Sequence, residues 1–175
     1  SEDIKQATPV KKSTTAGTGQ FSLFDAPQDS EHIQTKFERA TLKSVPHFYQ
    51  YIEGDLAFEL FLNQLQQQKS VCFDTETTNI DALKAELVGI AFSWEAHKGF
   101  YVPFPNEKAQ AQAVIEKLRS FFEDPSVEKI GQNLKYDLKV LHKYNVDIAG
   151  PLFDTMIAHY LINPDMRHNM NILAE

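Results

Sequence analysis

Two carboxylates stand at the end of an apolar run in residues 71–80, which read VCFDTETTNI. Asp74 and Glu76 are two positions apart, and side chains at i and i+2 of a strand point to the same face of a sheet. Two carboxylates this close repel each other, so each raises the pKa of the other. A divalent cation removes that repulsion, because hard cations such as Mg²⁺ prefer oxygen ligands. The pair alone leaves two interpretations open: a metal site, or a strand end that lies in solvent.

A third acid favours the metal site. Asp137 lies in the segment GQNLKYDLKVLHKY, three residues after Leu134 and four before Leu141. At helical spacing this places Asp137 along the apolar stripe and not opposite it. A carboxylate that faces a core needs a partner. Three acids from a strand end and a facing helix therefore predict a two-metal site, the kind of site that cleaves phosphodiester bonds.

The elements that must position these acids lie in residues 46–175. We expect strands at 47–52, 70–75, 87–94, 99–104 and 127–130, and helices at 55–68, 106–122, 133–144, 155–162 and from about 169 onward. Asp55, Asn106 and Asp154 are the expected N-caps of three of these helices. Short polar connections predict that the second, third and fourth strands form an antiparallel meander. This order indicates an α/β domain, a mixed sheet flanked by helices.

The chain length and composition indicate one globular domain with a loose end. The sequence has 175 residues, of which 42% are hydrophobic. Residues 1–45 include the stretch TPVKKSTTAGTGQ, which has almost nothing to bury, and we expect a flexible linker there. Residues 46–175 form the expected globular domain. No apolar run approaches the ~20 residues that a membrane span needs, and the polar N-terminus shows no signal peptide.

The charge distribution argues against a non-specific DNA-binding protein. The net charge is −7, and the acidic excess lies entirely in residues 46–175. Lys129, Lys135, Lys139 and Lys143 mark a local candidate for nucleic-acid contact, although charge alone favours a solvated helix face. The single cysteine, Cys72, lies in an apolar strand and is expected to be a small core residue in a reducing cytoplasm.

Five blocks of sequence resemble one family. They are FDTET at 73–77, LVGIAFS at 87–93, GQNLKYD at 131–137, FDTM at 153–156 and RHNMNILAE at 167–175. In this order they resemble the 3′→5′ exonuclease domain of bacterial family A DNA polymerases, the DNA polymerase I type. The resemblance covers roughly residues 46–175. It implies a ribonuclease-H-like fold and the DEDD exonuclease superfamily. It also implies a parent enzyme of DNA replication and repair whose polymerase domain shares the chain. In this family a 5′-nuclease domain can precede the exonuclease domain, and residues 1–45 would be the interdomain linker between these two.

The resemblance also implies a site. Asp74 and Glu76 correspond to metal ligands of the first motif and Asp137 to the ligand of the second motif. The cofactor is Mg²⁺, as two ions, with Mn²⁺ as a substitute, and the substrate is the 3′ end of single-stranded DNA. Ile80 matches an apolar residue that packs against the terminal base.

Four further positions match residues near the single strand and its phosphates: Gln132, Asn133, Tyr136 and Arg167. Gln132 and Asn133 stand at an expected helix N-terminus, where exposed N–H groups favour phosphate oxygens. Two structural alternatives stay open: Asn133 as a plain N-cap and Tyr136 as a core residue.

The sequence departs from the family pattern at its end. The family has a third motif, Tyr-x-x-x-Asp, that supplies a fourth acidic ligand some tens of residues beyond RHNMNILAE. Tyr160 and Asp165 do not have that spacing. We therefore expect an exonuclease domain that is incomplete at its C-terminus and has little activity alone. Two other functions stay open: an RNA-trimming exonuclease of the same superfamily, and a non-catalytic spacer, against which the three acids argue.

Overall fold

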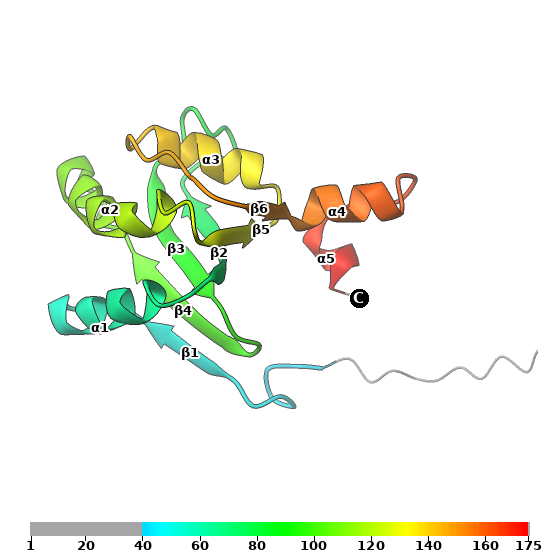
Figure 1. Cartoon of the computed structure of the whole chain (residues 1–175), viewed down its shortest axis with the longest axis horizontal. Coiled ribbons are helices and arrows are strands. Elements are labelled where there is room, and N and C mark those ends of the chain that lie inside the picture. Colours follow the sequence, from blue (N-terminus) through cyan, green and yellow to red (C-terminus); the bar gives the residue numbers. More distant parts are fainter. Residues whose placement is uncertain (1–39, 175) are drawn as a thin grey trace, which may run out of the picture. The chain divides into compact units, whose positions relative to one another are not determined.

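A mixed six-stranded sheet forms the centre of the domain (Figure 1). The computed structural model describes residues 40–174, so most of the expected linker, residues 1–39, lies outside the described residues. The strands are β1 (Phe48–Tyr51), β2 (Ser70–Thr77), β3 (Leu87–Ser93), β4 (Lys98–Pro103), β5 (Glu128–Gly131) and β6 (Leu152–Asp154). Their order across the sheet is β1-β4-β3-β2-β5-β6. The mixed α/β architecture expected from the sequence is confirmed.

The pairing of the strands is antiparallel in the middle of the sheet and parallel toward both edges. β2 pairs with β3 and β3 with β4 in antiparallel fashion, which confirms the expected meander. β1 joins β4 in parallel, and β5 and β6 extend the other side in parallel from β2. The strand β6 was not expected, because three residues are too short to show an alternation of apolar and polar side chains.

Five helices complete the described residues. They are α1 (Asp55–Leu65), α2 (Lys108–Phe122), α3 (Leu134–His142), α4 (Thr155–Ile162) and α5 (Met170–Leu173). The N-cap expected at Asp154 is confirmed. The N-caps expected at Asp55 and Asn106 are wrong, because Gly54 holds the N-cap position of α1 and Glu107 that of α2. None of these helices is both long and apolar enough to cross a membrane.

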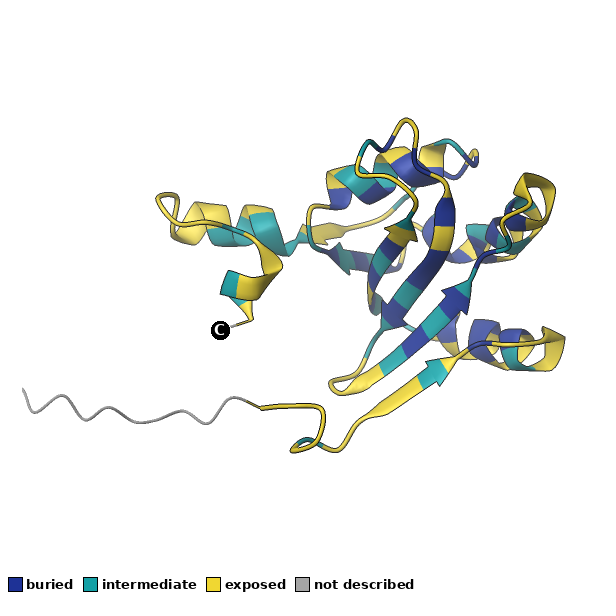
Figure 2. Ribbon diagram, turned by 180° about the vertical axis from the view of Figure 1, so that it is seen from behind, coloured by how far each residue is buried: buried dark blue, intermediate teal, exposed yellow. Residues whose placement is uncertain are grey.

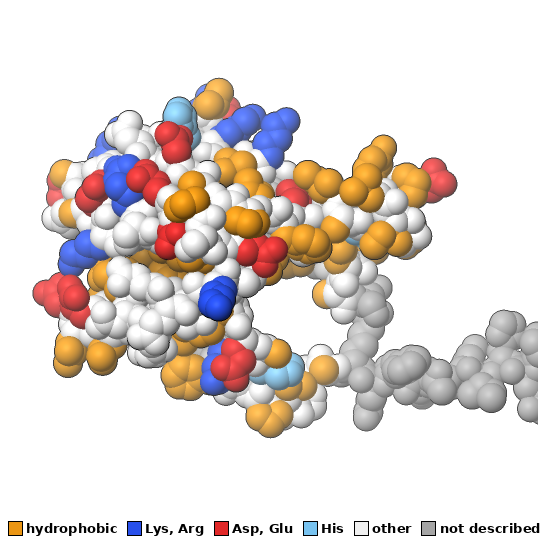
Figure 3. All heavy atoms as spheres, in the orientation of Figure 1, with side chains coloured by type: hydrophobic (Ala, Val, Ile, Leu, Met, Phe, Trp, Pro, Cys, Tyr) orange, Lys and Arg blue, Asp and Glu red, His pale blue; other side chains and the backbone are white. Residues whose placement is uncertain are grey.

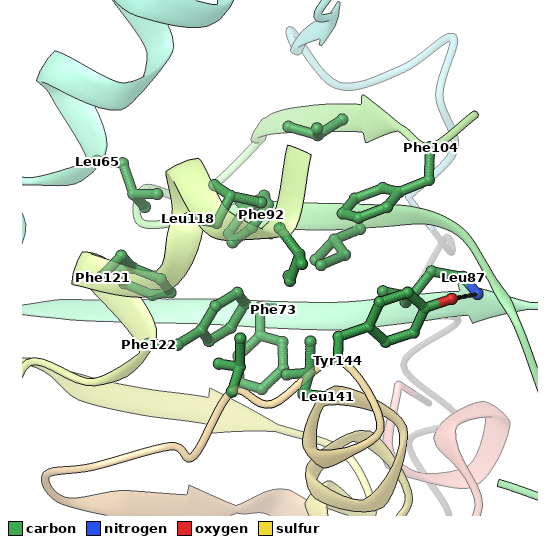
Figure 4. Close-up of a cluster of buried hydrophobic side chains, with 14 of the residues drawn as sticks. Leu65, Phe73, Leu87, Phe92, Phe104, Leu118, Phe121, Phe122, Leu141 and Tyr144 are labelled. Carbon is green, nitrogen blue, oxygen red and sulfur yellow. Dashed lines mark hydrogen bonds between the residues drawn. The ribbon is translucent and has the colours of Figure 1, made fainter. Parts of the chain in front are cut away.

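The helices α1, α2 and α3 lie along one face of the sheet and leave the opposite face open (Figures 1 and 2). The alternation of side chains along β2 explains which face the helices cover, because Phe73 and Thr75 are buried while their neighbours Cys72, Asp74 and Glu76 are not. Phe73 packs edge-to-face on Phe122 of α2 at 5.2 Å between ring centroids, and Phe92 lies 5.3 Å from Phe61 of α1. Each such ring contributes roughly 2 kcal/mol through burial. Figure 4 shows this aromatic core.

The hydroxyl of Tyr144 lies in the core and has hydrogen-bond partners there. The Tyr144 hydroxyl accepts a hydrogen bond from the Leu87 amide at 3.0 Å, the bond drawn in Figure 4, and donates to the Glu86 carboxylate at 2.8 Å. It ties the segment after α3 to the start of β3. Burial raises the pKa of Tyr144. These bonds hold α3 against the sheet next to the end of β2.

The structure contradicts the expectation that Cys72 is a core residue. Cys72 is exposed, because alternation along β2 places it on the same face as Asp74 and Glu76. With Tyr49, Tyr51 and other residues it lines a hollow on the open face of the sheet.

The four lysines of residues 129–143 do not form one surface. Lys129 is 0% exposed within β5. Lys143 donates to the Ala85 carbonyl and lies 3.5 Å from the Glu86 carboxylate. The expected solvated helix face is therefore limited to Lys135 and Lys139, which are exposed on α3.

Candidate active site

The free edge of β2 is where the site begins. The parallel pairing of β2 with β5 ends at Cys72 and Ile130, while β2 continues its pairing with β3 to Thr77. The Thr75 amide therefore has no partner from β5. It donates to the Asp137 carboxylate at 3.1 Å, and the Thr75 hydroxyl donates to the same Oδ1 at 2.5 Å. The helix α3 thus delivers Asp137 to the part of β2 that carries Asp74 and Glu76.

Asp137 is a buried carboxylate. It is 2% exposed and lies in the first turn of α3, which confirms that it belongs to the apolar side of that helix. The pKa of Asp137 is raised from 3.8 to about 6: burial raises it most, the hydrogen bonds from Thr75 lower it, and the charge of Asp74 adds to the rise. A carboxylate held in this way gains strongly from a cation.

Asp74 and Glu76 lie on the open face of β2, as their spacing predicts. Asp74 is half-buried, and its pKa is raised first by burial and then by the Glu76 carboxylate. Glu76 is exposed and lies opposite Gly89 on β3. A Cβ at Gly89 would lie 2.0 Å from the Tyr101 hydroxyl, so only glycine lets Tyr101 pack beside Glu76. Burial and the Glu76 charge raise the pKa of Tyr101.

One polar cavity of about 550 Å³ gathers most of the expected site residues. Its lining includes Asp74, Glu76, Ile80, Gln132, Asn133, Tyr136 and Asp137. Arg167 does not line it and is exposed between α4 and α5. Residues from β2, the loop after it and the start of α3 therefore converge on one place, although they are more than 50 positions apart in the sequence.

Tyr136 fixes the loop that follows β2. Its hydroxyl lies 2.5 Å from the Thr77 hydroxyl and also donates to the Asn79 carbonyl. Its ring packs partly against the core, so the core alternative describes part of its environment. Ile80, the residue after Asn79 in this loop, is 96% exposed. A large apolar side chain held this far into solvent beside a polar cavity is suited to contact a ligand.

The backbone at the start of α3 differs from the expectation. Asn133 has φ 60° and makes no side-chain capping bond, so it is not a plain N-cap. The N–H groups of Asn133 and Leu134 both donate to the Asp154 carboxylate. They are not free for a phosphate, and any contact of Asn133 with one must use its side chain.

Gln132 is engaged within the protein. Its side-chain amide donates to the His168 carbonyl at 2.7 Å, and its oxygen accepts from the Thr155 hydroxyl. Arg167 directly precedes His168, so these contacts connect the segment of Arg167 to the start of α3.

The carboxylates suit a hard cation without forming a closed metal cage. Among residues 40–174, no Lys or Arg forms an ion pair with Asp74, Glu76 or Asp137. Within the same range no three His, Cys, Asp or Glu side chains converge closely enough to hold an ion by themselves. Mg²⁺ is usually held by one or two carboxylates together with substrate phosphate and water. The donor set fits that ion better than it fits a structural metal.

Sequence reasoning missed Thr75 and the second role of Asp154. Thr75 is a polar residue on the core-facing side of β2, and that position was a usable signal, since a buried hydroxyl needs a partner. Asp154 was expected only as the cap of α4, and no local pattern indicates its contact with α3.

Comparison with known proteins shows the family to which the chain belongs. Residues 49–175 match the 3′-5′ exonuclease family. The chain is 35% identical over 135 residues to DNA polymerase I of Pseudomonas aeruginosa, covering 72% of the chain and 15% of that protein. It is 33% identical over 131 residues to DNA polymerase I of Borreliella burgdorferi, covering 73% and 14%. The chain thus spans only about a seventh of the length of these relatives.

Solved structures share the fold at low sequence identity. Brucella melitensis NrnC matches with a TM-score of 0.58 and 21% identity, over 74% of this chain and 59% of that one. Escherichia coli RNase D, an exoribonuclease involved in structured RNA processing, matches with a TM-score of 0.51 and 20% identity, over 66% and 29%. NrnC has also been solved with bound Mg²⁺, with a TM-score of 0.56, 22% identity, and coverage of 73% and 58%. The ribonuclease-H-like fold expected from the sequence is therefore confirmed.

Proposed function

The chain belongs to the 3′-5′ exonuclease family, and from this premise we propose that it carries the proofreading site of a DNA polymerase I. The proposed reaction is hydrolysis of the last phosphodiester bond at the 3′ end of single-stranded DNA, with release of a nucleoside 5′-monophosphate. The observation that carries the proposal is the meeting of three carboxylates at one cavity, one of them buried, with no cationic partner among residues 40–174.

Asp74, Glu76 and Asp137 are the proposed metal ligands. Divalent cations, Mg²⁺ with Mn²⁺ as a substitute, supply polarisation of the phosphate and a water of lowered pKa when bound there. Asp137 keeps its Oδ1 on Thr75 and has its other oxygen for a ligand. Burial, and then the charge of Glu76, raise the pKa of Asp74, and a bound cation would relieve both effects.

The remaining cavity residues are proposed to hold the DNA strand. Ile80, exposed at the rim, would pack against the terminal base, and Tyr136 holds the loop that presents it. The side chains of Gln132 and Asn133 line the same cavity and would contact the sugar-phosphate backbone. Arg167 would approach a phosphate from the adjoining segment. A paired 3′ end would have to melt before it reached the carboxylates, which gives a preference for single strands.

The activities of the whole protein are proposals as well. The relatives are much longer than this chain, and we propose that a polymerase domain follows in the parent protein. Residues 1–45 would be the interdomain linker to a preceding 5′-nuclease domain, and the protein would act in cytoplasmic DNA replication and repair. The family's fourth acidic ligand and its tyrosine would come from a segment beyond these residues, so the 175 residues alone are expected to be weak or inactive.

A second candidate is trimming of RNA. The likeness to RNase D favours it, since that enzyme is an exoribonuclease. The same carboxylates would serve either substrate, so the choice depends on contacts with the sugar and not on the metal site. A non-catalytic spacer is the third alternative, and the three retained acids argue against it.

Matched 5′-labelled DNA and RNA single strands would test these proposals in Mg²⁺ or Mn²⁺. The chain and the full-length parent protein should be compared, with Asp74→Ala in each as the control for contaminating nuclease. Trimming of DNA from the 3′ end by the parent, lost in Asp74→Ala, is the expected result. Preferential trimming of RNA would select the second candidate. No trimming of either strand by the parent would select the spacer.

A further inference from the structure

Asp154 joins the beginnings of two helices. Its Oδ1 accepts hydrogen bonds from the amides of Met156 at 2.9 Å and Ile157 at 3.3 Å, which makes it the N-cap of α4. The same carboxylate reaches across to α3. Its Oδ1 accepts from the Asn133 amide at 3.1 Å, and its Oδ2 accepts from the Leu134 amide at 2.8 Å. One side chain from the end of β6 therefore serves both helices.

The helix α3 has no cap of its own. The first turn of a helix leaves backbone N–H groups without partners, and an Asp, Asn, Ser or Thr at the N-cap normally supplies an acceptor. Asn133 occupies that position in a left-handed conformation and makes no such bond. The Asp154 carboxylate accepts these N–H bonds instead, and its negative charge is also favourable at the positive N-terminal end of the helix dipole. The start of α3 therefore depends on a residue that is 20 positions away from Leu134.

This remote cap acts within the turn that carries Asp137. Leu134 is buried and packs so closely on Gly131 that a Cβ there would lie 2.4 Å from a Leu134 methyl carbon. Asp137 follows in the same first turn and reaches the Thr75 amide. A shift of the helix start would move the Asp137 carboxylate relative to the edge of β2.

We propose that Asp154 is a positioning residue for the candidate metal site. It holds the first turn of α3 against β6, and through that turn it holds the Asp137 carboxylate on the free edge of β2. The proposal rests on the proposed function in one respect, because it takes Asp137 to be a metal ligand.

Two substitutions separate the two caps. Asp154→Asn keeps one oxygen, which can cap α4, but replaces the other by an amide that cannot accept from Leu134. Asp154→Ala removes both caps. The matched control is Asp124→Asn, since the Asp124 Oδ1 also accepts bonds from a local backbone amide and hydroxyl, both of Ser126, at 2.8 and 2.7 Å. That control makes the same change of charge at a turn outside the cavity.

Two measurements on the 175-residue chain test the proposal. Hydrogen exchange of the Thr75 amide reports whether Asp137 remains at β2, and paramagnetic broadening by added Mn²⁺ reports affinity at the carboxylates. We expect Asp154→Asn to speed exchange at Thr75 and Leu134 and to weaken Mn²⁺ binding by about tenfold, in line with other residues that orient metal ligands. Asp124→Asn should change neither. Exchange at the core amide of Phe92 reports the loss of global stability in each variant, and the increase at Thr75 in Asp154→Asn should exceed it.

The outcomes distinguish this inference from the proposed function. Faster exchange at Leu134 with Thr75 and Mn²⁺ affinity unchanged would make Asp154 a local cap and would overturn the inference. Absence of Mn²⁺ binding by the unmodified chain would count against the proposed metal site, while the exchange of Thr75 would still decide whether Asp154 positions Asp137. If Asp154→Ala fails to fold, Asp154→Asn carries both measurements, since it keeps the cap of α4.

Discussion

Lys129 and Asp137 are both buried charged residues, but the groups that surround the two charges differ. Lys129 is 0% exposed and donates to the carbonyls of Asp124 at 2.5 Å and Ala149 at 2.7 Å. Its ammonium also lies 5.5 Å from the centroid of the Phe121 ring. Asp137 is 2% exposed, accepts both hydrogen bonds from Thr75 through one oxygen, and lies close to a second carboxylate, Asp74.

The difference separates a structural charge from a functional one. The contacts of Lys129 tie the end of α2 to the turn before β6, and they offset the cost of burial with acceptors that point at the ammonium. Asp137 lies beside a polar cavity with another acid as its neighbour, an arrangement that weakens the fold unless a cation is present. Burial lowers the pKa of Lys129 and raises that of Asp137, so each charge is destabilised by burial, but the ammonium of Lys129 has two carbonyl acceptors and the nearby Asp124 charge that offset part of the cost.

The largest effect is expected when Lys129 is replaced. Lys129→Met fills most of the same space but removes the ammonium that donates to the Asp124 and Ala149 carbonyls. Loss of these charge-assisted bonds should lower the free energy of unfolding by about 2 to 4 kcal/mol, as measured by urea denaturation. Lys135→Met, at an exposed position on α3, is the control. A loss below 1 kcal/mol at Lys129 would show that its burial is not compensated as described.

Asp137→Asn should raise the free energy of unfolding, whereas Lys129→Met should lower it. The amide keeps an oxygen for the Thr75 donors and removes the buried charge. The free energy of unfolding of the metal-free chain at pH 7 should rise by about 1 to 3 kcal/mol, while Mn²⁺ binding should be lost. Asp165→Asn, at an exposed position, should do neither. A destabilised Asp137→Asn would mean that the ionised carboxylate contributes to the fold, as Lys129 does.

The pH dependence of stability should also show that ionisation of Asp137 destabilises the folded chain. The pKa of Asp137 is raised to about 6 in the folded chain, so between pH 3.8 and 6 the folded state binds the proton more tightly than the unfolded state. The stability that comes from this proton is full below pH 3.8 and is lost as the pH rises through 6. Unfolding free energies measured from pH 4 to 7, as the difference between the unmodified chain and Asp137→Asn, isolate this group. A difference that does not change with pH would contradict the raised pKa.

The smallest expected effect is that of Thr75→Val. Valine matches the shape of threonine but removes the hydroxyl that donates to Asp137 at 2.5 Å. Because that bond lowers the pKa of Asp137, its loss should raise the pKa above 6, which carbon-detected NMR titration of the carboxyl group would measure. The free energy of unfolding at pH 7 should fall by about 1 kcal/mol. An unchanged pKa would show that the Thr75 hydroxyl does not contribute to it.

Much of the fold could be predicted because its signals are local. Alternation in residues 70–75 placed Phe73 in the core and Asp74 and Glu76 on the other face, and the same rule, applied to Cys72, would have exposed it. Helical periodicity placed Asp137 beside Leu134 and Leu141. The strand β6 and the buried Lys129 escaped prediction, because β6 is only three residues long and nothing near Lys129 in the sequence shows which carbonyls surround it.

The apolar and polar periodicities by themselves determined which face each acid occupies, since a strand repeats every two residues and a helix about every 3.6. Only the tertiary structure decided that β5 leaves β2 after Cys72, so that the Thr75 amide takes Asp137, and that Asp154 caps α3 from β6. The physical reason is the distance along the chain between the groups that determine each feature. A periodicity depends on neighbouring residues in the chain, whereas the end of a strand pairing and a remote cap depend on groups that meet only when the chain has folded.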